Sequence, residues 1–105
     1  LYVDDMAEAS IFVLELDKTS YIKNTDPMLS HINIGTGIDI SIYDLATIIK
    51  LVVDFKGKLR FDESKPDGVK RKLVDISRLS AMGWSYSEKL EDGLRKTYKG
   101  YLNSI

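Results

Sequence analysis

The sequence predicts an α/β domain in which three to four helices alternate with a short pair of parallel strands. Apolar residues recur at helical spacing in three segments, at about residues 5–16, 42–53 and 88–103. Two shorter segments, residues 31–34 and 58–61, are β-branched and apolar or alternate between polar and apolar residues, which is typical of strands. A helix between two parallel strands would form a right-handed crossover.

The N-terminal part predicts the end of a strand followed by a helix. Residues 1–3 resemble a strand end, and Asp4 or Asp5 is expected to cap the helix, because a carboxylate satisfies the free N–H groups of a first turn. This helix should extend to about Leu16. Residues 21–29 are expected to form a loop, with a turn at residues 24–27.

The middle of the chain predicts a turn and then a second helix. Gly35-Thr36-Gly37 lacks the full Gly-x-Gly-x-x-Gly spacing, so it predicts a turn rather than a dinucleotide-binding loop. Ser41 followed by Asp44 has the spacing of a capping box, with Ser41 as the N-cap. The helix after this cap is expected to end near residue 53.

The C-terminal part predicts two more helices. Asp75 is expected to cap a short helix over residues 76–82, with Gly83 as the residue that ends it. A longer helix should run from about Glu88 to Asn103, because its apolar residues follow helical spacing at positions 90, 94, 98, 101 and 102.

Length and composition limit the possible functions. The 105 residues predict one domain, residues 1–105. Fifteen basic and 16 acidic residues give a net charge of −1, which argues against a nucleic-acid-binding or membrane-binding surface. The absence of cysteine fits a cytoplasmic protein, and no apolar run is long enough to span a membrane. No group of residues has the spacing of a metal site.

The most informative segment is SKPDGVKRKLVD, residues 64–75. A Pro-Asp-Gly turn, with glycine in the left-handed conformation, is expected to hold Asp67 beside the three cations at residues 70–72. Guanidinium and ammonium groups suit a diphosphate, and a carboxylate suits a sugar or base donor. The alternative is an ordinary solvated basic loop.

Three segments together resemble a known family: LYVDDMA at residues 1–7, SHINIGTG at 30–37 and the basic segment. They are similar to the C-terminal part of the GDP-L-fucose synthase family, which are extended short-chain dehydrogenases of the NAD-dependent epimerase/dehydratase superfamily. The similarity extends from residue 1 to about residue 102. It implies a small C-terminal substrate-binding domain, with the Rossmann domain missing from this chain.

The resemblance also implies site residues. Asp67 matches the family's substrate-binding aspartate, and Lys72 matches its nucleotide-contacting lysine. Arg71 is a further substrate-binding candidate of less certain direction, because adjacent side chains of an extended segment point to opposite sides. The sequence departs from the family at Val69-Lys70, where Thr-Pro is common, so the loop is expected to differ there in stiffness and charge.

The activity implied by the resemblance belongs to a longer parent enzyme. Such enzymes epimerise GDP-4-keto-6-deoxymannose and reduce it with NADPH to GDP-L-fucose. This chain lacks both the Tyr-x-x-x-Lys pair and the glycine fingerprint, so catalytic residues and NADPH are expected in the missing domain. The chain alone is expected to be inactive, and the parent to be a cytoplasmic homodimer that binds a GDP-sugar, without nucleic-acid or membrane partners.

Two further features bear on this expectation. The chain begins without methionine inside a strand-like segment, and its first two long helices are apolar on almost all sides, which favours a piece of a longer protein. Two alternatives stay open. One is the C-terminal domain of a UDP- or dTDP-sugar epimerase or dehydratase. The other is a non-enzymatic interaction domain whose basic loop binds an acidic partner.

Overall fold

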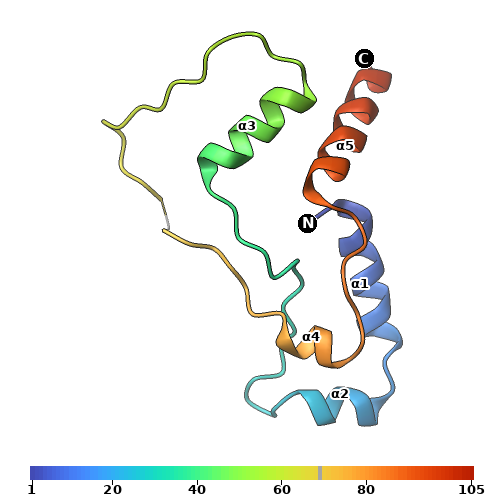
Figure 1. Cartoon of the computed structure of the whole chain (residues 1–105). Coiled ribbons are helices and arrows are strands. Elements are labelled where there is room, and N and C mark those ends of the chain that lie inside the picture. Colours follow the sequence, from blue (N-terminus) through green and yellow to red (C-terminus); the bar gives the residue numbers. More distant parts are fainter. Residues whose placement is uncertain (69) are drawn as a thin grey trace. The chain divides into compact units, whose positions relative to one another are not determined.

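The computed structural model describes residues 1–68 and 70–105, and these residues contain five helices (Figure 1). The helices are α1 (Val3–Glu15), α2 (Lys18–Asn24), α3 (Ile42–Val52), α4 (Ser77–Ala81) and α5 (Leu90–Ser104). The chain divides into two compact units. The first unit consists of Leu1–Ile38 and Leu73–Glu88, and the second of Asp39–Lys72 and Lys89–Ile105.

The predicted strand pair is wrong for the described part of the chain, where no strand is present. Backbone pairing between extended residues is limited there to one isolated bridge, between Asp26 and Leu29. The two expected strands belong to different units, residues 31–34 to the first and 58–61 to the second. A strand requires the hydrogen bonds of a neighbouring strand, and an alternating sequence pattern does not supply that partner.

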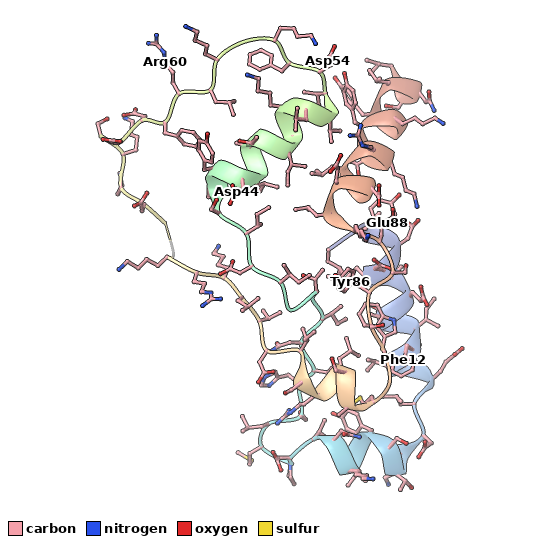
Figure 2. All side chains as sticks on the ribbon, in the orientation of Figure 1. Phe12, Asp44, Asp54, Arg60, Tyr86 and Glu88 are labelled. Atoms are coloured by element: carbon pink, nitrogen blue, oxygen red, sulfur yellow. The ribbon has the colours of Figure 1, made fainter. Side chains whose placement is uncertain are left out.

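The core of the first unit explains the alternation in residues 31–34. Ala9 of α1, Leu79 of α4 and Trp84 are buried together. Ile32 and Ile34 pack against this cluster, as do three other partly buried residues, Phe12, Val13 and Tyr86. Phe12 and Tyr86 are labelled in Figure 2. The alternate isoleucines therefore point to a helical core rather than to one face of a sheet.

The start of α1 differs from the prediction. Tyr2 is the N-cap and makes no side-chain capping bond, while Asp4 and Asp5 lie in the first turn. Asp5 is only 2% exposed, and its carboxylate accepts hydrogen bonds from residues 87 and 88. The donors are the Ser87 N–H at 3.2 Å, the Ser87 hydroxyl at 2.7 Å and the Glu88 N–H at 2.9 Å. Asp5 therefore satisfies a distant backbone segment instead of its own helix.

The loop expected at residues 21–29 is wrong in its first half, which belongs to α2. Asp17 caps this helix by accepting hydrogen bonds from the Ser20 N–H at 2.9 Å and the Ser20 hydroxyl at 2.6 Å. The second half is a tight turn, in which the Leu29 N–H donates to the Asp26 carbonyl at 2.9 Å. A local cap at Asp17 was enough to start a short helix in a segment with a weak apolar pattern.

The second unit is built on α3 and α5, which pack against each other (Figure 1). The predicted cap of α3 is confirmed, because the Asp44 N–H donates to the Ser41 hydroxyl at 3.0 Å, and that hydroxyl donates to the Asp44 carboxylate at 2.6 Å. Figure 2 shows Asp44 at this end of the helix. The Tyr43 and Phe61 rings lie 5.7 Å apart, so residues near 61 fold back toward α3 without forming a strand.

The two C-terminal helices are confirmed with small shifts. Gly83 ends α4 with a φ of +99°, the left-handed conformation that favours glycine. Its N–H donates to the Ser80 carbonyl at 3.0 Å, and the Trp84 N–H donates to the Leu79 carbonyl at 3.2 Å. The expected cap at Asp75 is displaced by one residue, because Ile76 is the N-cap of α4 and makes no side-chain capping bond. Asp75 lies one residue earlier and accepts a hydrogen bond from the Ser77 N–H at 2.9 Å. None of the helices within residues 1–68 and 70–105 is both long and apolar enough to cross a membrane.

Candidate functional site

Residues 64–68 and 70–72 of the basic segment belong to the second unit, and residues 73–75 belong to the first. Asp67, Arg71 and Lys72 are all exposed in the second unit. The expected Pro-Asp-Gly turn is wrong. Gly68 does not have a positive φ, and the turn forms earlier, where the Lys65 N–H donates to the Asp62 carbonyl at 3.3 Å. The expectation about the Val69–Lys70 loop cannot be assessed at Val69, which lies outside the described residues.

Asp62 explains why the turn forms where it does. Its carboxylate accepts hydrogen bonds from the Ser64 hydroxyl at 2.5 Å and the Ser64 N–H at 3.0 Å. An aspartate that bonds the backbone two residues ahead forms a turn by itself. The Ser64 hydroxyl makes the larger contribution and the Ser64 N–H the smaller one, and together they hold the pKa of the Asp62 carboxyl below its ordinary value. Asp62 is therefore a turn residue and not a candidate acid.

Arg71 has a partner that the sequence did not predict. Its Nε–H donates to Oδ2 of Asp39, and the two side chains form an ion pair. The other carboxylate oxygen of Asp39 accepts a hydrogen bond from the Ile40 N–H at 3.0 Å. Asp39 is 32 residues from Arg71 in the sequence, and no local motif connects them. Only the folded second unit brings this pair together.

Asp67 and Lys72 differ from Arg71. The residues that the structure describes offer no side-chain hydrogen bond or ion pair to either of them, and none joins Asp67 to the two cations. An exposed ammonium group and an exposed carboxylate are available to a ligand from solution. The segment therefore presents one guanidinium held by Asp39 and two solvated charged groups. Cations in this arrangement attract anions such as a diphosphate.

The described residues contain no group suited to a metal ion, and Gly35 and Gly37 do not suit a dinucleotide. In the described part of the chain, no group of three or more histidine, aspartate or glutamate side chains could hold a metal ion. A Cβ added to Gly35 would lie 2.8 Å from the Val74 side chain, and one added to Gly37 would lie 2.8 Å from Ile76. These glycines allow close packing against apolar side chains, so they do not form a cradle for a dinucleotide phosphate. Gly37 has a φ of +73°, as the predicted turn requires.

Arg78 is a second cation that the sequence analysis missed, and it has a structural environment. Its Nη1 donates to the carbonyl oxygens of Leu29 and His31, the latter at 2.8 Å, and its Nη2 lies 3.4 Å from Oδ2 of Asp26. An open pocket of about 370 Å³ lies beside it in the first unit. His31 contributes its backbone carbonyl oxygen here.

Comparison with solved structures identifies the class of protein. The chain superimposes on a GDP-6-OMe-4-keto-L-xylo-heptose reductase from Campylobacter jejuni with a TM-score of 0.85 and 37% identity, over 97% of this chain and 30% of the other. A GDP-mannoheptose C4 reductase from the same organism, solved with NADP bound, gives a TM-score of 0.78 and 36% identity, over 94% of this chain and 29% of the other. The fold is thus that of the C-terminal part of GDP-sugar reductases of the short-chain dehydrogenase type.

Comparison with curated sequences is more specific. GDP-L-fucose synthase from Escherichia coli is 53% identical over 104 residues, which are 99% of this chain and 32% of the relative. No family model matches the chain. The chain therefore spans about a third of the length of the curated relatives that it matches, and it is homologous to the C-terminal part of proteins named GDP-L-fucose synthase. The resemblance inferred from the motifs is confirmed.

Proposed function

We propose that this chain is a single substrate-binding domain of a longer GDP-sugar epimerase/reductase, and that it binds the GDP part of the substrate. The observation that carries the proposal is the homology to GDP-L-fucose synthases over almost the full chain, including the exposed basic segment. The three proposed binding residues are Asp67, Arg71 and Lys72.

Each binding residue has a chemical role in the proposal. Lys72 and Arg71 offset the charge of the diphosphate, and a guanidinium can bind two phosphate oxygens at once. Asp67 accepts a hydrogen bond from a donor on the nucleotide or the sugar. Binding energy from the GDP portion then positions the sugar, which is the part that reacts. The chain contributes specificity in this arrangement rather than the reacting groups.

The proposed reaction is the conversion of GDP-4-keto-6-deoxymannose to GDP-L-fucose. The ketone acidifies the neighbouring C–H bonds, so an acid/base pair can invert those two carbons before the ketone is reduced. NADPH would supply the hydride, and we place its site and the catalytic residues in the rest of the enzyme. Gly35 and Gly37 do not fit a dinucleotide, since the Val74 and Ile76 side chains occupy the space beside them.

Exposed apolar side chains support the proposal that this chain functions within a longer protein. On α1, Leu14 is 84% exposed, and on α3, Ile42 is 72% exposed. Helices of this kind gain free energy when further protein covers them. The cytoplasmic location and the homodimer stay predictions.

The proposal is tested by Lys72→Ala in the full-length enzyme. Loss of a charged hydrogen-bond donor to the diphosphate should raise KM for the GDP-sugar by about tenfold, while kcat changes little because the lost contact forms equally in the ground state and the transition state. The matched control is Lys99→Ala, an exposed lysine of α5 in the same unit, which should leave KM unchanged. An unchanged KM in the Lys72 variant would contradict the assignment.

The two alternatives predict different results in binding experiments. A UDP- or dTDP-sugar enzyme would prefer those nucleotides over GDP in competition assays. A non-enzymatic domain would bind an acidic protein in a salt-sensitive manner and would not bind free nucleotides. Preference for GDP over UDP and dTDP is the result that we expect.

A further inference from the structure

We infer that Asp39 is a positioning residue, which orients the Arg71 guanidinium so that its far end faces the diphosphate. This inference rests on the proposed function, because it assumes that the basic segment binds GDP. The geometric basis is the ion pair between Arg71 Nε and Asp39 Oδ2, within the second unit.

The ion pair connects an irregular segment to a helix. Residues 66–68 and 70–72 belong to no helix or strand, whereas Asp39 lies two residues before Ser41, the N-cap of α3. The Asp39 carboxylate is itself held, because Oδ1 accepts the Ile40 N–H at 3.0 Å. Oδ2 is then directed to Arg71. The long side chain of Arg71 is thereby held at Nε by a residue close to the start of α3.

The atom that Asp39 contacts determines what Arg71 can still bind. Arginine has a planar guanidinium with five N–H donors, one on Nε and four on the two Nη nitrogens. Because Asp39 contacts Nε, the end formed by the two Nη nitrogens is left for a ligand. That end matches two phosphate oxygens in a bidentate geometry. Lys72, the next residue in the sequence, offers a second positive charge without directional preference.

Asp39 also carries a negative charge, which by itself would repel a diphosphate. The side chains of Arg71 and Asp39 are 66% and 37% exposed, so water and salt screen this repulsion. Holding Arg71 in one orientation removes part of the rotamer entropy that binding would otherwise cost. We infer that preorganisation outweighs repulsion at physiological ionic strength.

The test measures GDP binding to the full-length enzyme by calorimetric titration. Asp39→Asn keeps the shape and the bond to the Ile40 N–H but removes the charge that holds Arg71. We expect GDP affinity to fall by roughly threefold to fivefold, as for the loss of an exposed ion pair. KM for the GDP-sugar should rise by the same factor, with kcat unchanged. Asp39→Glu, which keeps the charge, should retain most of the affinity.

A double-mutant cycle and a matched control separate positioning from a general effect on folding. If Asp39 acts through Arg71, Asp39→Asn should have no further effect in an Arg71→Ala background. The control is Glu91→Gln, which breaks another exposed carboxylate–arginine pair of the second unit, between Glu91 and Arg95 at 2.5 Å. This control should leave GDP affinity unchanged.

The outcomes distinguish the inference from the proposed function. Equal or tighter GDP binding by Asp39→Asn, together with weaker binding by Arg71→Ala, would overturn the inference and leave the proposed function intact. An equal effect of Asp39→Asn with and without Arg71 would also overturn it. If neither Arg71→Ala nor Lys72→Ala weakens GDP binding, the proposed function fails, and the inference fails with it.

Discussion

The two units use arginine in opposite ways. In the first unit, Arg78 donates to two backbone carbonyl groups and approaches Asp26, and its side chain is 28% exposed. In the second unit, Arg71 makes one ion pair through Nε, and its side chain is 66% exposed. Both residues are basic positions in polar segments of the sequence. The number of N–H donors that are bonded within the fold, rather than the residue type, therefore distinguishes an arginine with a structural role from one that can bind a ligand.

Carboxylates show the same contrast. Asp5 in the first unit is buried and accepts hydrogen bonds from residues 87 and 88, whereas Asp67 in the second unit is exposed. A buried carboxylate with several donors contributes to folding, since removing it leaves those donors without partners. An exposed carboxylate is available to a ligand. Substitutions at these residues test whether the two units differ in this way.

The largest expected effect is that of Asp5→Ala. Three donors from residues 87 and 88 would lose their acceptor, and a small cavity would form. We expect the free energy of unfolding to fall by about 3 kcal/mol. Urea denaturation of the full-length enzyme measures this change. Asp4→Ala is the matched control, because Asp4 is exposed and lies in the same helical turn. If the two variants were equally stable, the hydrogen bonds of Asp5 with residues 87 and 88 would not contribute to folding, contrary to this prediction.

An intermediate effect on stability or binding is expected when Arg78 and Arg71 are each replaced by lysine. Arg78→Lys loses the forked donor geometry that reaches two carbonyl groups, so the free energy of unfolding should fall by about 1–2 kcal/mol. Arg71→Lys should change stability by less than about 0.5 kcal/mol but should weaken GDP binding in a calorimetric titration. A stability loss for Arg71→Lys, or a GDP-affinity loss for Arg78→Lys, would remove the distinction between the two units.

The smallest expected effect concerns pH. The Ser20 hydroxyl and then the Ser20 N–H donate to Asp17 and hold the pKa of that carboxyl below its ordinary value. Since the folded-state pKa is the lower one, the stabilisation of α2 is present above the unfolded value of about 3.9. It is lost as pH falls through the folded pKa.

An NMR titration of the Asp17 carboxyl carbon checks this prediction. Ser20→Ala removes the hydroxyl donor and should move the pKa of Asp17 back toward its ordinary value. Asp62, which has the same kind of lowering by Ser64 in the second unit, is the internal reference and should not move in that variant. A pKa of Asp17 at its ordinary value in the unaltered protein would show that the cap is not formed.

Local sequence chemistry predicted several elements correctly. The Ser41 cap of α3 and the Gly83 end of α4 formed as expected, because each depends on residues within five positions of one another. The motif resemblance was also sufficient to identify the homologous family. Such features require no knowledge of distant contacts, since capping and left-handed glycine are local preferences.

Distant contacts caused several of the errors. Residues 31–34 have a strand-like pattern, yet Ile32 and Ile34 pack on Leu79 and its neighbours instead of pairing with another strand. Asp4 or Asp5 was expected to cap the first helix, and Asp5 instead bonds residues more than 80 positions away. The Asp39–Arg71 ion pair likewise joins residues without a common motif. A sequence pattern specifies which face of a segment is apolar, but it does not specify which segment will cover that face.

The amino-acid sequence alone was sufficient to predict the positions of the main helices, the three candidate binding residues and the relationship to GDP-sugar enzymes. These follow from local backbone preferences and from motifs that remain readable along the chain. The tertiary structure decided that the described residues form two helical units without strands, that Asp5 and Arg78 are structural, and that Asp39 holds Arg71. Hydrogen bonds between distant residues depend on the whole folded path of the chain, so only the folded molecule specifies them.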